Sequence, residues 1–435
     1  MKSKLLALAK RAVPVLALSA PLWGCADLDP SLNESVDPLA NASDNGLPVL
    51  NGLSTNNGLG TMNGLGTLNG LGTLNGLGAL NGLSTNNGLG TLNGLSTTNG
   101  LMTSPETRVM VKYIAKCALM SGTTLMKADQ YGTMYTFPGS IGLGPSWLTS
   151  SCDTGCQQRL TACLLAMANR DGKHVSIELV SAGTGMSVIG SSGDDVTYPN
   201  QEGTTFGNLF PSPPQMFTCA GAQADHAEQV KRYCIAGTGC DLFTKTAPCA
   251  TAGTQTCEKG PGGAPVCSAK SCKAPDGTTY NAPITIFVRN RMEAGNFDAT
   301  GGSDFGGGVV AYPMSGGTMG INSIDDEDWI QHSDVQFGAD GSATTFTAYI
   351  ATMNAGNAIE LRVDSPTGPV IASITTASTG GWTPSYEKAQ SASISSAGIS
   401  GKHTVFVTFN GAANRASGAN GGGRQIGNIS YIEVK

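Results

Sequence analysis

The sequence predicts a mixed, multi-domain protein, with a small disulfide-rich α+β domain in the middle and an all-β sandwich at the C-terminal end. Seven of the twelve cysteines fall between Cys219 and Cys272, in a stretch rich in Gly, Thr, Ala and Pro that has no core of its own. Helical periodicity precedes this stretch, and short alternating runs follow it from about Ile284. A chain of 435 residues is long enough for two such domains and a spacer.

The charge of the chain argues against one class of partner. Only 13% of the residues are charged and the formal net charge is −6. Such a chain does not build the basic field that nucleic acid requires, so we predict no nucleic-acid partner. Low charge is typical of proteins that bind neutral polymers such as polysaccharides.

Residues 1–24 are predicted to be a signal peptide. A basic segment ends at Arg11, and the apolar run Val13 to Leu22 that follows is too short to cross a bilayer permanently. The segment Leu22-Trp23-Gly24-Cys25 resembles the lipobox of bacterial lipoproteins. The resemblance implies that Cys25 is lipidated and that the mature chain stays in the cell envelope, outside the cytoplasm, on the outer membrane or cell surface. The alternative is a plain secretory signal beside an unrelated cysteine.

A tether and a repeat separate this N-terminal region from the first domain. Residues 25–44 are acidic, small and rich in proline, which predicts a disordered tether. In residues 45–102 the triplet Asn-Gly-Leu begins at every sixth position, ten times, from Asn45 to Asn99. The even period keeps each leading Leu on one face of an extended backbone. A short β-solenoid and a Gly-rich flexible spacer both fit, and we favour the spacer because such a segment has little to repay its ordering entropy.

The Cys-rich domain is predicted over residues 103–280. A first helix starts at Ser104-Pro105, a second runs from Cys156 to Met167, and a strand covers His174 to Val180. Because an exported chain meets an oxidising compartment, the cysteines are predicted to form disulfides. Zinc is the alternative, but the chain has no Cys-x-x-Cys pair. Apart from Cys25, eleven cysteines remain, so at least one is free, capped or paired with another molecule.

No catalytic motif is apparent, and we predict that the protein is not an enzyme. The chain has four histidines and lacks a Gly-x-Ser-x-Gly elbow, a His-Glu-x-x-His motif and a phosphate loop. Asp225 beside His226 could orient a general base, but a solvent-facing Asp-His pair on a polar helix is far more common. A hydrolase in the Cys-rich region is therefore the least favoured hypothesis.

The C-terminal residues 281–435 carry strand patterns and then a resemblance. The predicted strands, which argue for a sandwich, are Thr345 to Ile350, Ile359 to Val363, Val370 to Ile374, His403 to Phe409 and Ile429 to Val434. Five segments, in order, resemble successive motifs of family 6 carbohydrate-binding modules: Met292-Glu293-Ala294, Ile324 to Ile330, Ile359 to Gly368, Thr379-Gly380-Gly381-Trp382 and Asn428-Ile429-Ser430-Tyr431. The resemblance covers about residues 284–435. It implies a jelly-roll sandwich that binds glycans without catalysis.

The resemblance also implies which residues bind the sugar. In that family two aromatic rings clamp a sugar and an Asn bonds its hydroxyls; Trp382 matches one ring and Asn428 matches the Asn. Trp382 could instead be a buried core residue, but it follows a Gly-Gly turn, where side chains are displayed. The second ring position falls on Ser323, so Tyr312 is the candidate replacement. Trp329 is predicted to be core, and the acidic run 325–328 is predicted to be a solvated turn.

The family commonly carries a structural calcium, and no other cofactor is predicted. Glu293 matches one calcium ligand, whereas the other expected acidic positions fall on Gly295 and Ser430. The leading hypothesis is a membrane-anchored surface lipoprotein that binds polysaccharide through its C-terminal module. The alternative is a structural envelope protein whose sugar site is degenerate.

Overall fold

The computed structural model describes the chain in segments. These are residues 47–51, 53–54, 101–103, 105–169, 175–181, 198–211, 213–224, 226–235, 243–247, 253–259, 265–289, 291–302, 309–314, 318–338, 341–395, 399–411 and 425–435. The predicted lipidation residue Cys25, the acidic tether and most of the repeat lie outside them, so those predictions stay predictions. Across these segments, no helix combines the length and the apolar character that a membrane crossing needs.

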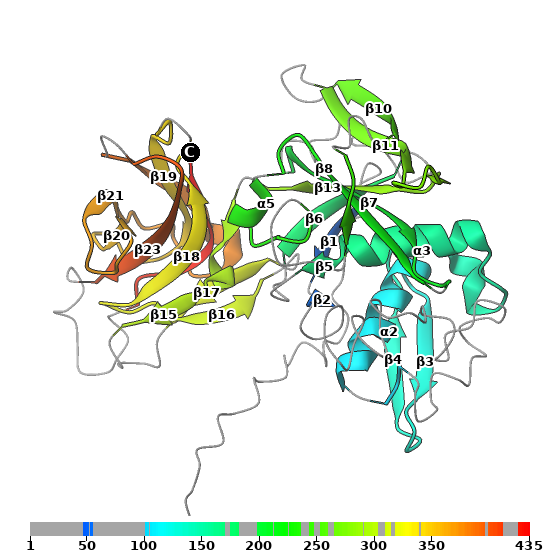
Figure 1. Cartoon of the computed structure of the whole chain (residues 1–435). Helices are drawn as coiled ribbons and strands as arrows, with labels where there is room; N and C mark the ends of the chain where they lie inside the picture. The colour runs from blue at the N-terminus through cyan, green and yellow to red at the C-terminus, as the bar shows by residue number, and fades with distance from the viewer. Residues whose placement is uncertain are drawn as a thin grey trace, which may run out of the picture. The chain divides into compact units, whose positions relative to one another are not determined.

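The Cys-rich region is built on a sheet of the order β1-β6-β13-β7-β8-β9 (Figure 1). Its strands are β1 (Leu47–Asn51), β6 (Val175–Val180), β13 (Ile284–Val288), β7 (Asn200–Asn208), β8 (Gln215–Ala220) and β9 (Thr244–Lys245). Neighbours are antiparallel except β8 and β9, which are parallel. The predicted strand at β6 is confirmed. So are the two predicted helices, α2 (Pro105–Ala118) and α3 (Thr154–Ala166).

Two segments belong to this sheet that the sequence pattern assigns elsewhere. The pattern places β13 at the start of the C-terminal sandwich, but it pairs with β6 and β7 instead. Every residue of β13 is buried, as expected for a central strand covered on both faces. β1 comes from the first repeat unit, and β2 (Leu53–Ser54) pairs with β5 (Ala168–Asn169). The start of the repeat is therefore part of the Cys-rich domain and not a free spacer.

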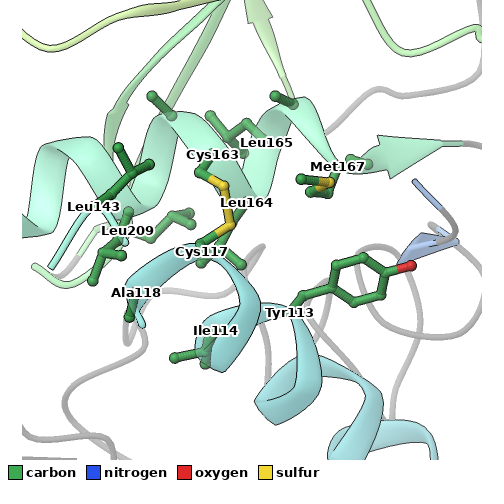
Figure 2. Close-up of a cluster of buried hydrophobic side chains, with 14 of the residues drawn as sticks. Tyr113, Ile114, Cys117, Ala118, Leu143, Cys163, Leu164, Leu165, Met167 and Leu209 are labelled. Carbon is green, nitrogen blue, oxygen red and sulfur yellow. A yellow bond between two sulfur atoms is a disulfide. The ribbon is translucent and has the colours of Figure 1, made fainter. Parts of the chain in front are cut away.

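Helices α2 and α3 share a buried core that a disulfide crosses (Figure 2). Cys117 of α2 is bonded to Cys163 of α3, and both side chains are fully buried. Ile114, Leu164 and Leu209 are buried beside the bond. α3 also packs against the sheet, where the Thr205 hydroxyl donates to the Ala162 carbonyl over 2.8 Å. The prediction that the cysteines form disulfides is therefore confirmed for this pair.

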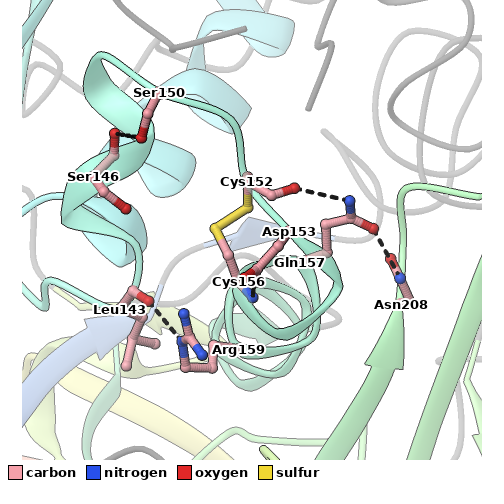
Figure 3. The surroundings of a disulfide bond; sticks show 9 residues. All are labelled: Leu143, Ser146, Ser150, Cys152, Asp153, Cys156, Gln157, Arg159 and Asn208. Atoms are coloured by element: carbon pink, nitrogen blue, oxygen red, sulfur yellow. Dashed lines mark hydrogen bonds between the residues drawn. A yellow bond between two sulfur atoms is a disulfide. The ribbon is translucent and has the colours of Figure 1, made fainter. Parts of the chain in front are cut away.

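A second disulfide fixes the start of α3 (Figure 3). Cys152 is bonded to Cys156, four residues later. Between them Asp153 is the N-cap, and its carboxylate accepts the Cys156 N–H over 2.8 Å. Gln157 donates to the Cys152 carbonyl and accepts from the Asn208 amide on β7. The bond therefore ties the helix start to the sheet as well as to its own loop.

Smaller elements complete the region. A hairpin of β3 (Thr124–Ala128) and β4 (Met134–Pro138) packs on α2, and β10 (Gly253–Lys259), β11 (Pro265–Lys273) and β12 (Thr279–Tyr280) form a separate sheet. Cys219 and Cys234 each take part in a disulfide as well. Cys272 is the free cysteine among the described residues, and burial raises the pKa of its thiol to about 12. This free thiol agrees with the odd cysteine count.

The C-terminal domain is a sandwich of two antiparallel sheets (Figure 1). One sheet has the order β16-β17-β24-β19-β22, with β14 also paired to β24; the other has the order β15-β18-β23-β20-β21. The strands are β14 (Met292–Glu293), β15 (Ala299–Gly301), β16 (Val310–Pro313), β17 (Met319–Asn322), β18 (Trp329–Gln336), β19 (Thr345–Ala351), β20 (Ala358–Val363), β21 (Val370–Thr375), β22 (Lys388–Ser393), β23 (Lys402–Asn410) and β24 (Asn428–Val434). Side chains such as Ile350, Leu361 and Val407 fill the space between the sheets. All five predicted strands are confirmed to within one residue at each end.

Candidate functional site

The loop between β21 and β22 displays Trp382. Gly380 has a left-handed backbone with φ +94°, and the Tyr386 ring lies against Gly381 so closely that any Cβ there would collide with it. Only glycine fits both positions, which explains the Gly-Gly pair. Trp382 is half-buried and does not belong to the sandwich core. Trp382 is therefore not a residue of the sandwich core.

Asn428 is held directly beside this loop. It is the first residue of β24, and its Nδ2 donates to the Trp382 carbonyl oxygen over 2.6 Å. Its Oδ1 is buried and accepts no hydrogen bond from any described residue. A buried amide oxygen without a donor costs free energy, roughly 1–3 kcal/mol, unless a ligand or water supplies one. The structure thus brings together the two residues that the sequence singled out.

Three loops are tied together at this end of the sandwich by threonines that the sequence analysis missed. Thr379 donates its N–H to the Thr352 carbonyl, and the Thr352 N–H donates to the Thr379 hydroxyl. The Thr352 hydroxyl then donates to the Ile426 carbonyl over 2.6 Å. These bonds anchor the Trp382 loop to the chain that leads into Asn428. A threonine has no sequence signature for such a role, so no motif could have revealed it.

Tyr312 is the candidate for the second ring of an aromatic clamp. It lies half-buried in β16, and among the described residues its ring makes no ring contact with Trp382. Burial raises the pKa of Tyr312, and the negative charge of Glu387, which follows the Trp382 loop, raises it further. Ser323 occupies the expected clamp position with φ +55° and is half-buried. Ser323 therefore supplies no ring, and Tyr312 as the second ring of the site stays a prediction.

Two exposed side chains on these linked loops were also missed. Tyr386 is 47% exposed and packs on the Gly381 backbone, while Met353 is 56% exposed in the loop that Thr352 anchors. Tyr386 follows Trp382 by four residues, and an aromatic at that spacing from a Gly-Gly-Trp turn is the signal that could have found it. Exposed apolar side chains on anchored loops are typical of binding surfaces.

Trp329 and the acidic run have structural roles. Trp329 is half-buried rather than core as predicted, because it points away from the space between the sheets and packs edge-on against Phe406. In the acidic run, Asp328 accepts the Asp325 N–H and Asp326 accepts the Gly411 N–H. Burial raises the pKa of Asp328 to about 6, and the neighbouring Asp325 and Asp326 charges add to this. The turn is as predicted, but it is not solvated as predicted, because Asp326 and Asp328 are buried.

Glu293 is buried, and its carboxylate oxygens accept backbone hydrogen bonds. Oε1 accepts the Ser176 N–H and Oε2 accepts the Met319 N–H, each over 2.9 Å. Burial raises the pKa of Glu293 to about 7. The described residues contain no cluster of three or more His, Cys, Asp or Glu side chains able to hold a metal ion. A calcium there would need mostly backbone and other neutral oxygens, and calcium at Glu293 stays a prediction.

These features define a class of protein domain: a two-sheet β-sandwich whose loop end displays an aromatic side chain beside an amide. Residues 296–421 match the family model of the carbohydrate binding module (family 6). The C-terminal domain of this chain is therefore a family 6 carbohydrate-binding module, as its motifs predicted.

Two relatives of known identity each match about a third of the chain or less. Endo-1,4-beta-xylanase A of Thermoclostridium stercorarium is 31% identical over 133 residues, which is 31% of this chain and 24% of that protein. Arabinoxylan arabinofuranohydrolase of Paenibacillus polymyxa is 34% identical over 112 residues, 25% of this chain and 17% of that protein. The chain thus spans a quarter or less of either relative. A solved family 6 module from Clostridium cellulolyticum, in complex with xylose, is 27% identical with a TM-score of 0.27, over 33% of this chain and 95% of that one.

Proposed function

We propose that this protein binds polysaccharide without catalysis, through the loop end of its C-terminal module. The observation that carries the proposal is the bond from Asn428 to the Trp382 backbone, within a domain of a sugar-binding family. The bond orients the amide so that its buried Oδ1 is the remaining acceptor. A pyranose ring packed on the indole would offer hydroxyl donors to such an acceptor.

The site is open on one side, and this shapes the expected affinity. With Ser323 in place of a ring, a sugar would contact aromatic carbon on one face only unless Tyr312 supplies the second ring. Loss of one aromatic contact weakens binding by roughly 1 kcal/mol. We therefore expect weak binding of single sugars and stronger binding of long chains that also contact Tyr386 and Met353.

Xylan and arabinoxylan are the first polysaccharides to test, because two relatives of this module carry names that refer to them. β-Glucan, agar and chitin complete the panel. We further propose that the module is displayed on the cell envelope by a lipid on Cys25, as the Leu22 to Cys25 segment suggests. Membrane attachment and sugar binding are separate proposals and need separate tests.

Affinity gel electrophoresis of the exported chain with Cys25→Ser tests the sugar proposal. The whole chain is used because β13 lies in the sheet of the Cys-rich domain, so a cut near residue 284 would remove a central strand. We expect retardation by at least one polysaccharide, lost in Trp382→Ala. Tyr131→Ala, which changes an 83% exposed aromatic on the β3–β4 hairpin, is the matched control and should migrate like the parent.

The outcomes separate the competing functions. Retardation that survives Trp382→Ala would refute the site but keep polysaccharide binding. No retardation across the panel, with the chain shown to be folded, would favour a structural envelope protein with a degenerate site. Sugar release by the chain would favour a hydrolase. In the Cys-rich region, Asp225 and the side chain of His226 lie outside the described residues.

A further inference from the structure

The outer edge of β6 is an acceptor for one extended strand. β6 is buried along its whole length, from Val175 to Val180. On one side it pairs with β13, and on the other it pairs with β1. A buried strand whose edge had no partner would leave a row of backbone N–H and C=O groups unpaired, which is costly. The Cys-rich domain therefore needs a strand at the β1 position.

The strand that fills this position is one unit of the repeat. In β1, Leu47 lies opposite Leu179, Leu50 opposite Ser176 and Asn51 opposite Val175. The same pattern, Leu-x-x-Leu-Asn-Gly, recurs in the units that begin at Leu65, Leu71, Leu77 and Leu89. Most of the pairing energy of an edge strand comes from its backbone, which these units share.

The period of the repeat preserves the fit. Moving a strand by an odd number of residues would turn every side chain to the other face of the sheet. Units of six residues move it by an even number, so Leu65 would take the place of Leu47, and Leu68 that of Leu50. Each shift by a whole number of units restores the same alternation against β6.

We propose that the β6 edge is a docking site for the repeat of the same chain, and that units besides Leu47–Asn51 can occupy it. Exchange from Leu47 to Leu65 would transfer eighteen residues from the downstream connection to the membrane-side tether. The reach of the domain from its N-terminal attachment would then change in steps of six residues. This proposal does not depend on sugar binding.

β1 is the preferred occupant for a reason visible in its sequence. It has Pro48 where the four similar units have glycine. Proline limits the freedom of the unfolded chain and is tolerated on an edge strand, whereas glycine loses the most entropy on becoming extended. A unit of the same chain also has a higher effective concentration than one from a second copy. The exchange should therefore be revealed by weakening β1.

Replacement of repeat units in the exported chain with Cys25→Ser tests the proposal. In one variant Leu47–Asn51 becomes Gly-Ser-Gly-Ser-Gly; in a second variant the four similar units are changed in this way and β1 is kept; in a third all five are changed. We expect the first two to lower the melting temperature by less than about 3 °C and the third by more than about 8 °C. A first variant that loses as much as the third would overturn the proposal.

Disulfide trapping gives a direct readout that does not rely on stability. Ser176→Cys with Leu50→Cys should form a bond in the parent, because residues opposite each other on paired strands lie within disulfide reach. Ser176→Cys with Leu68→Cys should form the bond when Leu47–Asn51 has been replaced. The control is Ser176→Cys with Thr67→Cys, because the side chain at position 67 would point to the opposite face of the sheet. Failure of the Ser176→Cys, Leu68→Cys variant to form this bond, or a bond formed only between two chains, would overturn the intramolecular exchange.

Discussion

The backbone N–H of Ser176, in the sheet of the Cys-rich domain, donates to Oε1 of Glu293, a residue of the first strand of the C-terminal sandwich, over 2.9 Å. The other oxygen of the same carboxylate accepts the Met319 N–H inside the sandwich. Glu293 is only 4% exposed, so the bond between the two domains depends on a buried ionisable group. The stability of this contact should therefore depend on pH.

The raised pKa of Glu293 predicts that the folded protein loses stability as pH rises. Burial raises its pKa from 4.5 to about 7 in the folded state, so the folded state holds a proton that the unfolded chain releases. This contribution is complete below pH 4.5 and is lost as pH rises through 7. We expect the free energy of unfolding to fall by roughly 3 kcal/mol over this window on account of Glu293.

Urea unfolding at several pH values, with EDTA to remove any calcium, measures this slope. Glu293→Gln keeps the shape of the side chain but removes the titration. The difference in unfolding free energy between the parent and Glu293→Gln should change between about pH 4.5 and about pH 7.5. Asp328, whose pKa is also raised, is present in both proteins and cancels. A constant difference across the window would show that Glu293 does not titrate there.

Lys231 makes a second buried contact between the Cys-rich domain and the C-terminal sandwich. Its side chain is 2% exposed, and its ammonium lies 2.6 Å from the Asp298 carboxylate and also donates to the Ser333 carbonyl. Lys231→Met leaves the Asp298 charge and the carbonyl without this donor. Since Asp298 is 28% exposed, we expect a cost of about 2 kcal/mol, below the range for fully buried pairs.

The matched control for Lys231 is Lys402, which pairs with Glu228 at the same junction. Lys402 is 43% exposed, so Lys402→Met should cost less than about 1 kcal/mol. Chemical denaturation of both variants gives the comparison. Equal losses in the two variants would mean that burial does not set the strength of these pairs.

The sequence predicts elements better than it predicts partners. The helices at α2 and α3 and five sandwich strands were located from periodicity, because the apolar face of an element is written in its own residues. The sheet to which β13 belongs was not predicted. A buried five-residue strand such as Ile284–Val288 carries no information about which strands lie beside it. Its neighbours β6 and β7 lie far upstream in the sequence.

In the candidate site, too, the sequence predicted individual residues better than the contacts between them. Trp382 and Asn428 were found because each occupies a motif with a chemical role, and the structure places them in contact. The Thr352 and Thr379 bonds were not found, because they depend on two loops meeting in space. Tyr312 was proposed from its proximity in sequence alone. Its strand, β16, is paired with β17, and the role of its ring in the site stays a prediction.

The two defined disulfides should differ in their value to the fold. Cys117 and Cys163 are separated by 46 residues and Cys152 and Cys156 by four. On the loop-entropy relation the first bond stabilises by about 4 kcal/mol and the second by about 2 kcal/mol. Paired Cys→Ala variants compared by urea unfolding test this order. A larger loss from the Cys152–Cys156 pair would indicate that the contacts of Gln157 and Asp153 at the start of α3 depend on that bond.

Replacement of Asn428 should weaken sugar binding by more than the loss of fold stability alone explains. Asn428→Ala removes the donor to the Trp382 carbonyl and also the free Oδ1. Thr379→Val loosens the same loop by removing the hydroxyl that accepts the Thr352 N–H, but it leaves the amide intact. We expect each to lower the unfolding free energy by about 1–2 kcal/mol. If Oδ1 contacts the sugar, affinity for a polysaccharide that retards the parent should fall at least about fivefold further in Asn428→Ala than in Thr379→Val. Equal losses of affinity would mean that Asn428 only positions the indole.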